Sequence, residues 1–91
     1  MIRFLKIRTS KDALGGVKTM YLQVERETPK AFFGRKVNRS TLADDSYTRK
    51  DGVIVDMHHL VLKSAIAWIQ PMEEDRKYGG LVPVGAITRP E

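Results

Sequence analysis

An alternation of apolar and polar residues over positions 20–25 is the clearest structural signal in the chain. A period of two is typical of a strand that buries one face, so we expect a half-buried strand here. Residues 2–8 also have the character of a strand, but their apolar positions change phase at Phe4 and Leu5. That change predicts either a bulge or a strand buried on both faces. The apolar positions of the first pattern are Met20, Leu22 and Val24.

Glycine, proline and polar clusters mark the boundaries of the next predicted elements. Residues 31–37 predict a strand, in which Gly34 marks a bend or a close approach of another backbone. Residues 38–50 are polar and predict a long loop or a hairpin connection. Residues 81–84 predict a last strand, which Pro83 restricts to the edge of a sheet because proline has no backbone donor.

The densest apolar run, residues 52–71, must form the centre of the core. Residues 53–55 predict a core strand, but residues 56–70 fit two structures. Their apolar residues fall at helical spacing, with Asp56 suited to an N-cap and Pro71 to a stop. Their β-branched and aromatic residues favour strands, which we prefer. We therefore predict a mainly β fold, a small, strongly bent antiparallel sheet or barrel; the alternative is an α+β fold with a helix near residues 56–70.

Length and composition indicate one ordinary globular domain. The 91 residues suffice for a single domain over residues 1–91, with residues 88–91 predicted as a frayed tail. The chain has no cysteine, which excludes disulfides and thiolate metal sites. No apolar run approaches the ~20 residues of a membrane span, and residues 1–8 lack the apolar block of a secretory signal. We therefore expect a cytoplasmic protein without a membrane partner.

Positive charge is concentrated in the first part of the chain. The net charge is +5, whereas residues 1–40 contain ten Lys or Arg and three Asp or Glu, a balance of +7. The remaining residues are therefore slightly acidic. Such asymmetry predicts a cationic surface for phosphates or for an acidic protein, although lysine and arginine also serve only to solubilise the outer faces of strands.

Three segments resemble the strand order of small Sm-like or SH3-like β-barrels. They are residues 21–24, 33–37 and 60–71. In Sm-like proteins a glycine lies in the second strand, and the last motif has an apolar pair, a short basic turn, an isoleucine and a closing strand. Gly34 and residues 62–66 correspond to these features, with Lys63 and Ser64 in place of the family's arginine-glycine turn. The resemblance implies a small barrel and, for Sm-like proteins, RNA binding.

The strongest candidate site is a set of basic and aromatic residues. Lysine and arginine neutralise phosphates, and an exposed phenylalanine can stack on a base for roughly 1–3 kcal/mol. Adjacent residues of a strand face opposite sides, so one of Phe32 and Phe33 belongs to the core and the other is partly exposed. The polar loop after this strand extends the same surface. The predicted nucleic-acid-binding residues are Lys30, Phe32, Arg35, Lys36, Arg39, Tyr47, Arg49, Lys50 and Lys63.

No catalytic, metal or cofactor site is predicted. The adjacent His58 and His59 chelate one metal poorly, since they point to opposite faces of a strand and lie about 100° apart on a helix. Asp44, Asp45 and Asp51 stand in a polar loop, where carboxylates act as turn or capping residues rather than as a general acid and base. No phosphate-binding loop or nucleophile motif is present. An enzyme is therefore not expected.

Two functions from different classes fit these features. The first is a small non-enzymatic protein that binds RNA or DNA through its basic face. The alternative is a protein-interaction module, such as a phage-type inhibitor or an assembly adaptor, that docks on an acidic protein surface. Trp68 is expected in the core, whereas an exposed Trp68 would anchor a protein partner. We also predict a homo-oligomer, with residues 81–84 or the Trp68 strand at the contact.

Overall fold

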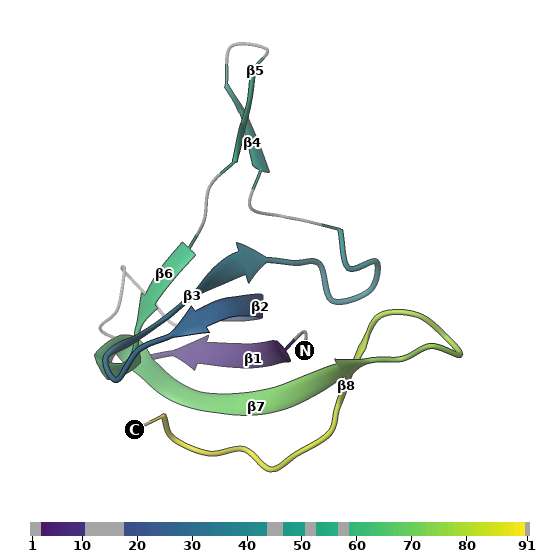
Figure 1. Cartoon of the computed structure of the whole chain (residues 1–91). Helices are drawn as coiled ribbons and strands as arrows, with labels where there is room; N and C mark the ends of the chain where they lie inside the picture. Colours follow the sequence, from purple (N-terminus) through teal and green to yellow (C-terminus); the bar gives the residue numbers. More distant parts are fainter. Residues whose placement is uncertain (1–2, 11–17, 44–46, 51–52, 57–58, 91) are drawn as a thin grey trace.

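The computed structural model describes residues 3–10, 18–43, 47–50, 53–56 and 59–90, and it shows a protein built from antiparallel strands (Figure 1). Six strands form one sheet in the order β6-β3-β2-β1-β7-β8, and two form a separate hairpin, β4-β5, that projects from the sheet. The strands are β1 (Arg3–Thr9), β2 (Thr19–Glu27), β3 (Ala31–Lys36), β4 (Tyr47–Lys50), β5 (Val53–Asp56), β6 (His59–Leu62), β7 (Ile66–Glu74) and β8 (Leu81–Pro83).

The prediction of a mainly β fold is confirmed, and the helix alternative near residues 56–70 is wrong for the residues of that range that the structure describes. They form the end of β5, then β6, a three-residue 3₁₀ turn (η1, Lys63–Ala65) and β7. Burial alternates along β6, where Leu60 is 54% exposed and Val61 is 7% exposed. The strand preference of β-branched residues outweighs the helical spacing here. No helix in the described residues is long and apolar enough to cross a membrane.

The predicted strand at residues 53–55 is present, but it does not join the central sheet. It forms β5, which pairs with β4 from Tyr47↔Asp56 to Lys50↔Val53. The intervening sequence Asp51-Gly52 is a strong hairpin signal, and such a signal favours local pairing over pairing with a distant strand.

Both faces of the sheet carry buried residues, and β1 contributes to each face. Phe4 packs against a small second cluster, whereas Leu5 is fully buried in the main core. The register of β1 with β2 runs without a shift from Arg3 to Arg8. The phase change in the sequence is therefore a strand buried on both faces and not a bulge. The main core contains Leu5, Ile7, Leu22, Phe32, Val61, Ile66 and Ile69; the second cluster contains Val37, Met72 and Leu81, with Phe4, Tyr21 and Leu42 packed against it.

The six-stranded sheet is open, with β6 and β8 as its outer strands. The short η1 nevertheless joins β6 directly to the start of β7, and Val61 and Ile66 share the main core. The Lys63 ammonium on η1 donates to the Glu27 carboxylate at 2.6 Å, which ties this turn to the end of β2. Strands β6 and β7 therefore contribute to one common core, but the ends of the sheet are not paired, so the predicted barrel is not confirmed.

Gly34 lies where two backbones approach closely, as the sequence predicts. It sits in register between Val24 on β2 and His59 on β6. A Cβ atom at this position would overlap the backbone carbonyl oxygen of Gln23. Since that oxygen belongs to a neighbouring strand and not to a flexible side chain, only glycine fits here without displacing β2.

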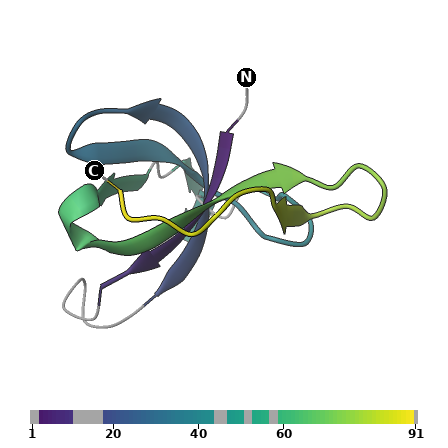
Figure 2. The same cartoon turned by 90° about the horizontal axis from the view of Figure 1, so that it is seen from below.

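The chain from β8 onward runs along the edge of β7 (Figures 1 and 2). After β8, the Val84 amide donates to the Pro71 carbonyl at 3.0 Å, and Thr88 exchanges two backbone hydrogen bonds with Ile69. The predicted edge strand is thus confirmed, and Thr88, which the sequence places in a frayed tail, is hydrogen-bonded to the sheet. Consequently the strand that carries Trp68, β7, has neighbours on both sides.

Candidate nucleic-acid interface

The face of the sheet opposite the main core carries basic and aromatic side chains on three adjacent strands. In the register of β1, Lys6 lies opposite Tyr21 on β2, and Arg8 lies opposite Trp68 on β7. Residues directly opposite each other on antiparallel strands share a face. Lys6 and Arg8 also share a face, because they are two positions apart on one strand. We call the surface formed by Lys6, Arg8, Tyr21 and Trp68 the platform.

Lys6 is at the centre of the platform, between the two aromatic rings. Its Nζ atom lies 5.9 Å from the centre of the Tyr21 ring and 5.7 Å from the centre of the Trp68 ring. Both distances are within the ~6 Å range of a cation–π interaction. The ammonium is therefore held over the sheet by two rings that come from different strands.

All four side chains of the platform are half-buried, so each combines a packed part with a part in contact with solvent. Arg8 donates a hydrogen bond to the Thr19 hydroxyl at 2.6 Å, which fixes its guanidinium over the neighbouring strand. Tyr21 also packs against the second cluster. These contacts restrict the side chains in advance, and restricted side chains lose little conformational entropy when a ligand binds.

The second cluster lies toward the other end of the same face and meets the platform at Tyr21. There, Leu42 from the turn after β3 packs against the buried cluster of Val37, Met72 and Leu81. The turn is held by the Asn38 side chain, which accepts from the Ser40 and Thr41 amides, and by the Leu81 amide, which donates to the Arg39 carbonyl. Lys6, Arg8 and Trp68, in contrast, belong to neither of the two buried clusters of the described residues and keep part of their surface in solvent.

A second pairing of a cation with a ring lies farther along the same face. The Arg26 guanidinium is 4.3 Å from the centre of the Phe33 ring, and the two residues are opposite each other on β2 and β3. Arg35, on the same side of β3, forms an ion pair with Glu25 at 3.1 Å. Arg26 and Phe33 therefore extend the platform toward β3, whereas the charge of Arg35 is partly neutralised.

Two of the residues predicted from the sequence, Phe32 and Lys63, lie on the core side of the sheet. Phe32 is 1% exposed and therefore belongs to the core, whereas Phe33 on the other face is half-buried and in contact with Arg26. The Lys63 side chain is 9% exposed and bonds to Glu27, which also accepts from Arg3 at 2.5 Å. The hydrogen bonds from Lys63 and then Arg3 lower the pKa of the Glu27 carboxyl below its usual value of 4.5.

The other predicted residues are not gathered at one place. Lys30 is exposed in the turn between β2 and β3, and Arg39 is exposed in the turn after β3. Lys36 lies opposite Leu22 and therefore on the other face of the sheet from Arg35. Lys30 and Lys63 line one shallow depression together with Pro29, Leu62 and Ser64.

Three predicted residues, Tyr47, Arg49 and Lys50, lie in β4. The structure describes the backbone pairing of this strand with β5, and the side chains of the hairpin lie outside the described set. Their place relative to the platform therefore stays a prediction.

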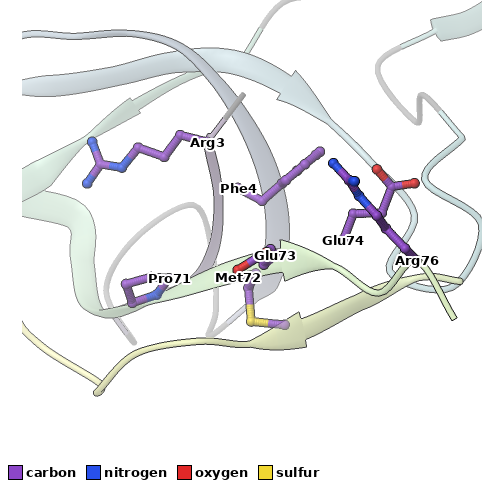
Figure 3. Close-up of a pocket in the computed structure, with 7 residues that line it drawn as sticks. All are labelled: Arg3, Phe4, Pro71, Met72, Glu73, Glu74 and Arg76. Atoms are coloured by element: carbon purple, nitrogen blue, oxygen red, sulfur yellow. The ribbon is translucent and has the colours of Figure 1, made fainter. Parts of the chain in front are cut away.

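A hollow beside the ends of β1 and β7 is lined by two arginines and two glutamates (Figure 3). Glu74 and Arg76 lie together at one end of the hollow, whereas Arg3 extends toward the other end. Arg3 is already bonded to Glu27. The charged groups of the hollow are therefore dispersed and of both signs, unlike the two cations of the platform. Among the described residues, no group of His, Asp and Glu side chains could hold a metal ion.

The platform was not predicted from the sequence, which places Trp68 in the core. A usable signal exists in residues 4–8, where basic residues alternate with fully buried ones and so point away from the core. The partners of Lys6 on β2 and β7 follow only from the register.

Comparison with known proteins adds no assignment. No protein-family model matches the chain, no curated protein matches its sequence, and no solved structure matches its fold.

Proposed function

We propose that this protein is a small nucleic-acid-binding protein and that the platform is its contact surface. The observation that carries the proposal is the position of Lys6 between Tyr21 and Trp68. Cations interleaved with aromatic rings on an accessible surface provide what a nucleic acid needs, namely positive charge for phosphates and flat surfaces for bases.

The charge around the platform supports the same conclusion. The residues that flank Lys6 in the register, Tyr21 and Gln70, are uncharged, and so are Thr19 and Trp68 beside Arg8. The two cations are therefore not compensated by a carboxylate opposite them on a neighbouring strand. Arg26 adds a third positive charge farther along the same face.

The proposal is tested by binding of a labelled oligonucleotide, followed by fluorescence anisotropy at ~50 and ~200 mM salt. The test variant carries Lys6→Gln and Arg8→Gln. The matched control carries Arg76→Gln and Lys77→Gln, which remove the same charge from an exposed turn between β7 and β8. We expect the affinity of the unchanged protein to fall steeply with salt, because binding releases counterions from the phosphates.

The platform variant is expected to bind about tenfold more weakly at low salt, and its salt slope to fall by about one unit for each phosphate that it no longer neutralises. The control should keep both the affinity and most of the slope. Equal losses in the two variants would show that only net charge matters. Absence of binding at low salt in the unchanged protein would refute the proposal.

A protein-interaction module is the second candidate, favoured by apolar side chains exposed on the outer strand β6 and on the segment after β8. Leu60 and Leu62 on β6 are 54% and 49% exposed, and Val84 and Ile87 beyond β8 are 53% and 55% exposed. Outer strands with such side chains can pair with another chain, which includes a second copy of this protein. A stoichiometric protein partner recovered from a nuclease-treated lysate would favour this candidate over the first.

We also infer that the sheet is an open variant of the Sm-like or SH3-like architecture. The apolar pair, short basic turn, isoleucine and closing strand expected from the resemblance correspond to the end of β6, η1, Ile66 and β7. The shared burial of Val61 and Ile66 supports this inference. The proposed binding function does not depend on it.

A further inference from the structure

We infer that the ligand of the platform is single-stranded nucleic acid, whose unpaired bases stack on Trp68 and Tyr21. This inference rests on the proposed function and specifies its ligand class. The arrangement of two rings and two cations on the sheet favours a single strand over a duplex.

The first argument is the shape of the surface. Trp68 and Tyr21 lie on β7 and β2, which flank β1 on either side. Neighbouring strands are about 4.8 Å apart, so the two rings are separated by roughly two such spacings. Duplex bases have their faces covered by their neighbours, and a sheet face does not enter a groove as a helix or a narrow ribbon does. Unpaired bases, in contrast, present a free face to a ring.

The second argument is the order of charges and rings. Lys6 stands between the rings, and Arg8 stands directly beside Trp68 in the register. A single strand alternates flexible phosphates with bases, so one strand can place a phosphate at Lys6 while bases on either side reach the two rings. Stacking of this kind is tolerant of sequence, because every base has a π face.

The third argument is the rigidity of the rings. Both rings are half-buried, and Tyr21 packs against the second cluster. Farther along the same face, the Phe33 ring is likewise held, in contact with the Arg26 guanidinium. Rings that are held before binding stack with a small entropic loss, which favours a stacking role over that of a flexible surface side chain.

The experiment compares three probes of equal length, about 12 nucleotides, at ~50 mM salt. They are a single-stranded thymidine oligonucleotide, the same backbone with abasic sites, and a duplex. Trp68 is the only tryptophan in the chain, so its intrinsic fluorescence reports stacking directly in the unchanged protein. Anisotropy of a dye on each probe gives the affinity independently of this signal.

We expect the single strand to bind most tightly and to quench Trp68. The abasic probe should bind at least about tenfold more weakly with little quenching, because it retains the phosphates but has no bases. The variant Trp68→Leu should lose this preference for bases, and Trp68→Phe should restore most of it. Circular dichroism of each variant verifies the fold.

The remaining outcomes separate the inference from the proposed function. Equal affinity for the abasic and thymidine probes, or tightest binding of the duplex, would overturn the stacking inference and leave nucleic-acid binding intact. Failure of all three probes to bind would remove the proposed function itself. If Trp68→Leu does not fold, the comparison of probes on the unchanged protein still decides between stacking and binding by charge alone.

Discussion

The Lys6 ammonium lies 5.7 Å from the centre of the Trp68 indole ring, although the two residues are far apart in the sequence. The antiparallel pairing of β1 with β7 brings them together, and Tyr21 completes the arrangement from β2. The platform is thus a property of the sheet register and not of any continuous segment.

The close approach at Gly34 predicts a strong dependence of stability on this residue. In Gly34→Ala the new methyl group would overlap the Gln23 carbonyl oxygen, so β2 and β3 must separate. We expect a loss of several kcal/mol in the free energy of unfolding, a large share of the stability of a domain this small. Chemical denaturation followed by circular dichroism measures it.

Gly79→Ala is the matched control for this prediction. Gly79 has a φ angle of 78° and open space around its missing Cβ, so alanine there costs only the backbone strain of about 1–2 kcal/mol. Equal losses in the two variants would contradict the steric account of Gly34.

The ion pairs of Glu27 predict a specific loss of stability in acid. Because the pKa of Glu27 is lowered in the folded protein, its contribution is fully present above its usual value of 4.5 and is lost as the pH falls through the lowered pKa. Glu27→Gln should therefore reduce stability at pH 7, by about 0.5–1 kcal/mol since Glu27 is partly exposed. The difference from the unchanged protein should shrink below pH 4.5.

Thermal unfolding between pH 7 and pH 3 checks this prediction, with Glu73→Gln on β7 as the control carboxylate. A difference between Glu27→Gln and the unchanged protein that stays constant down to the lowest pH would show that the ion pairs contribute nothing to the acid response.

The two adjacent phenylalanines should separate stability from binding. Phe32 is 1% exposed in the main core, so Phe32→Ala should cost about 3–5 kcal/mol. Phe33 is half-buried under Arg26, so Phe33→Ala should cost less stability and should weaken oligonucleotide binding. Denaturation and anisotropy on the same samples compare the two effects. If Phe33→Ala were the more destabilising variant, the main core would lie on the Phe33 side of β3, which would contradict this account.

Self-association should proceed through the segment that follows β8. Val84 is 53% exposed, and we predict a dimer at micromolar concentration that Val84→Lys weakens. Leu60→Lys, on the opposite outer strand, should leave the dimer intact. Analytical ultracentrifugation distinguishes the species. A monomeric unchanged protein would rule out the dimer, and a loss of the dimer only in Leu60→Lys would move the contact to β6.

The strands were predictable where local pattern decides the structure. Met20, Leu22 and Val24 alternate in sequence and pack on the main core or within it. The pairing partner of β5 was not predictable in the same way. An apolar strand has the same sequence pattern whether it pairs within a hairpin or joins the central sheet. The sequence predicted that another backbone approaches Gly34 closely, but it did not identify Gln23 as the residue that does so.

The site was less predictable than the fold, for a physical reason. Basic and aromatic residues are contiguous in residues 30–39, which is why a site was predicted there. Successive residues of a strand point to opposite faces, however, so contiguous residues do not form one surface. Phe32 consequently lies in the core, and Lys63, in the turn η1, bonds to Glu27. Trp68 was assigned to the core because apolar residues surround it in sequence, whereas the register places it beside Arg8.

The most direct test of the central claim is a ¹⁵N NMR titration with a single-stranded oligonucleotide at low salt. It measures the chemical-shift changes of the backbone amides and of the indole N–H. We predict that the largest changes fall on Lys6, Arg8, Tyr21 and the Trp68 indole N–H, with smaller changes at Arg26 and Phe33. Changes centred on Lys30 and Lys63, on the outer strands β6 and β8, or nowhere in the protein would contradict the assignment of the platform as the nucleic-acid interface.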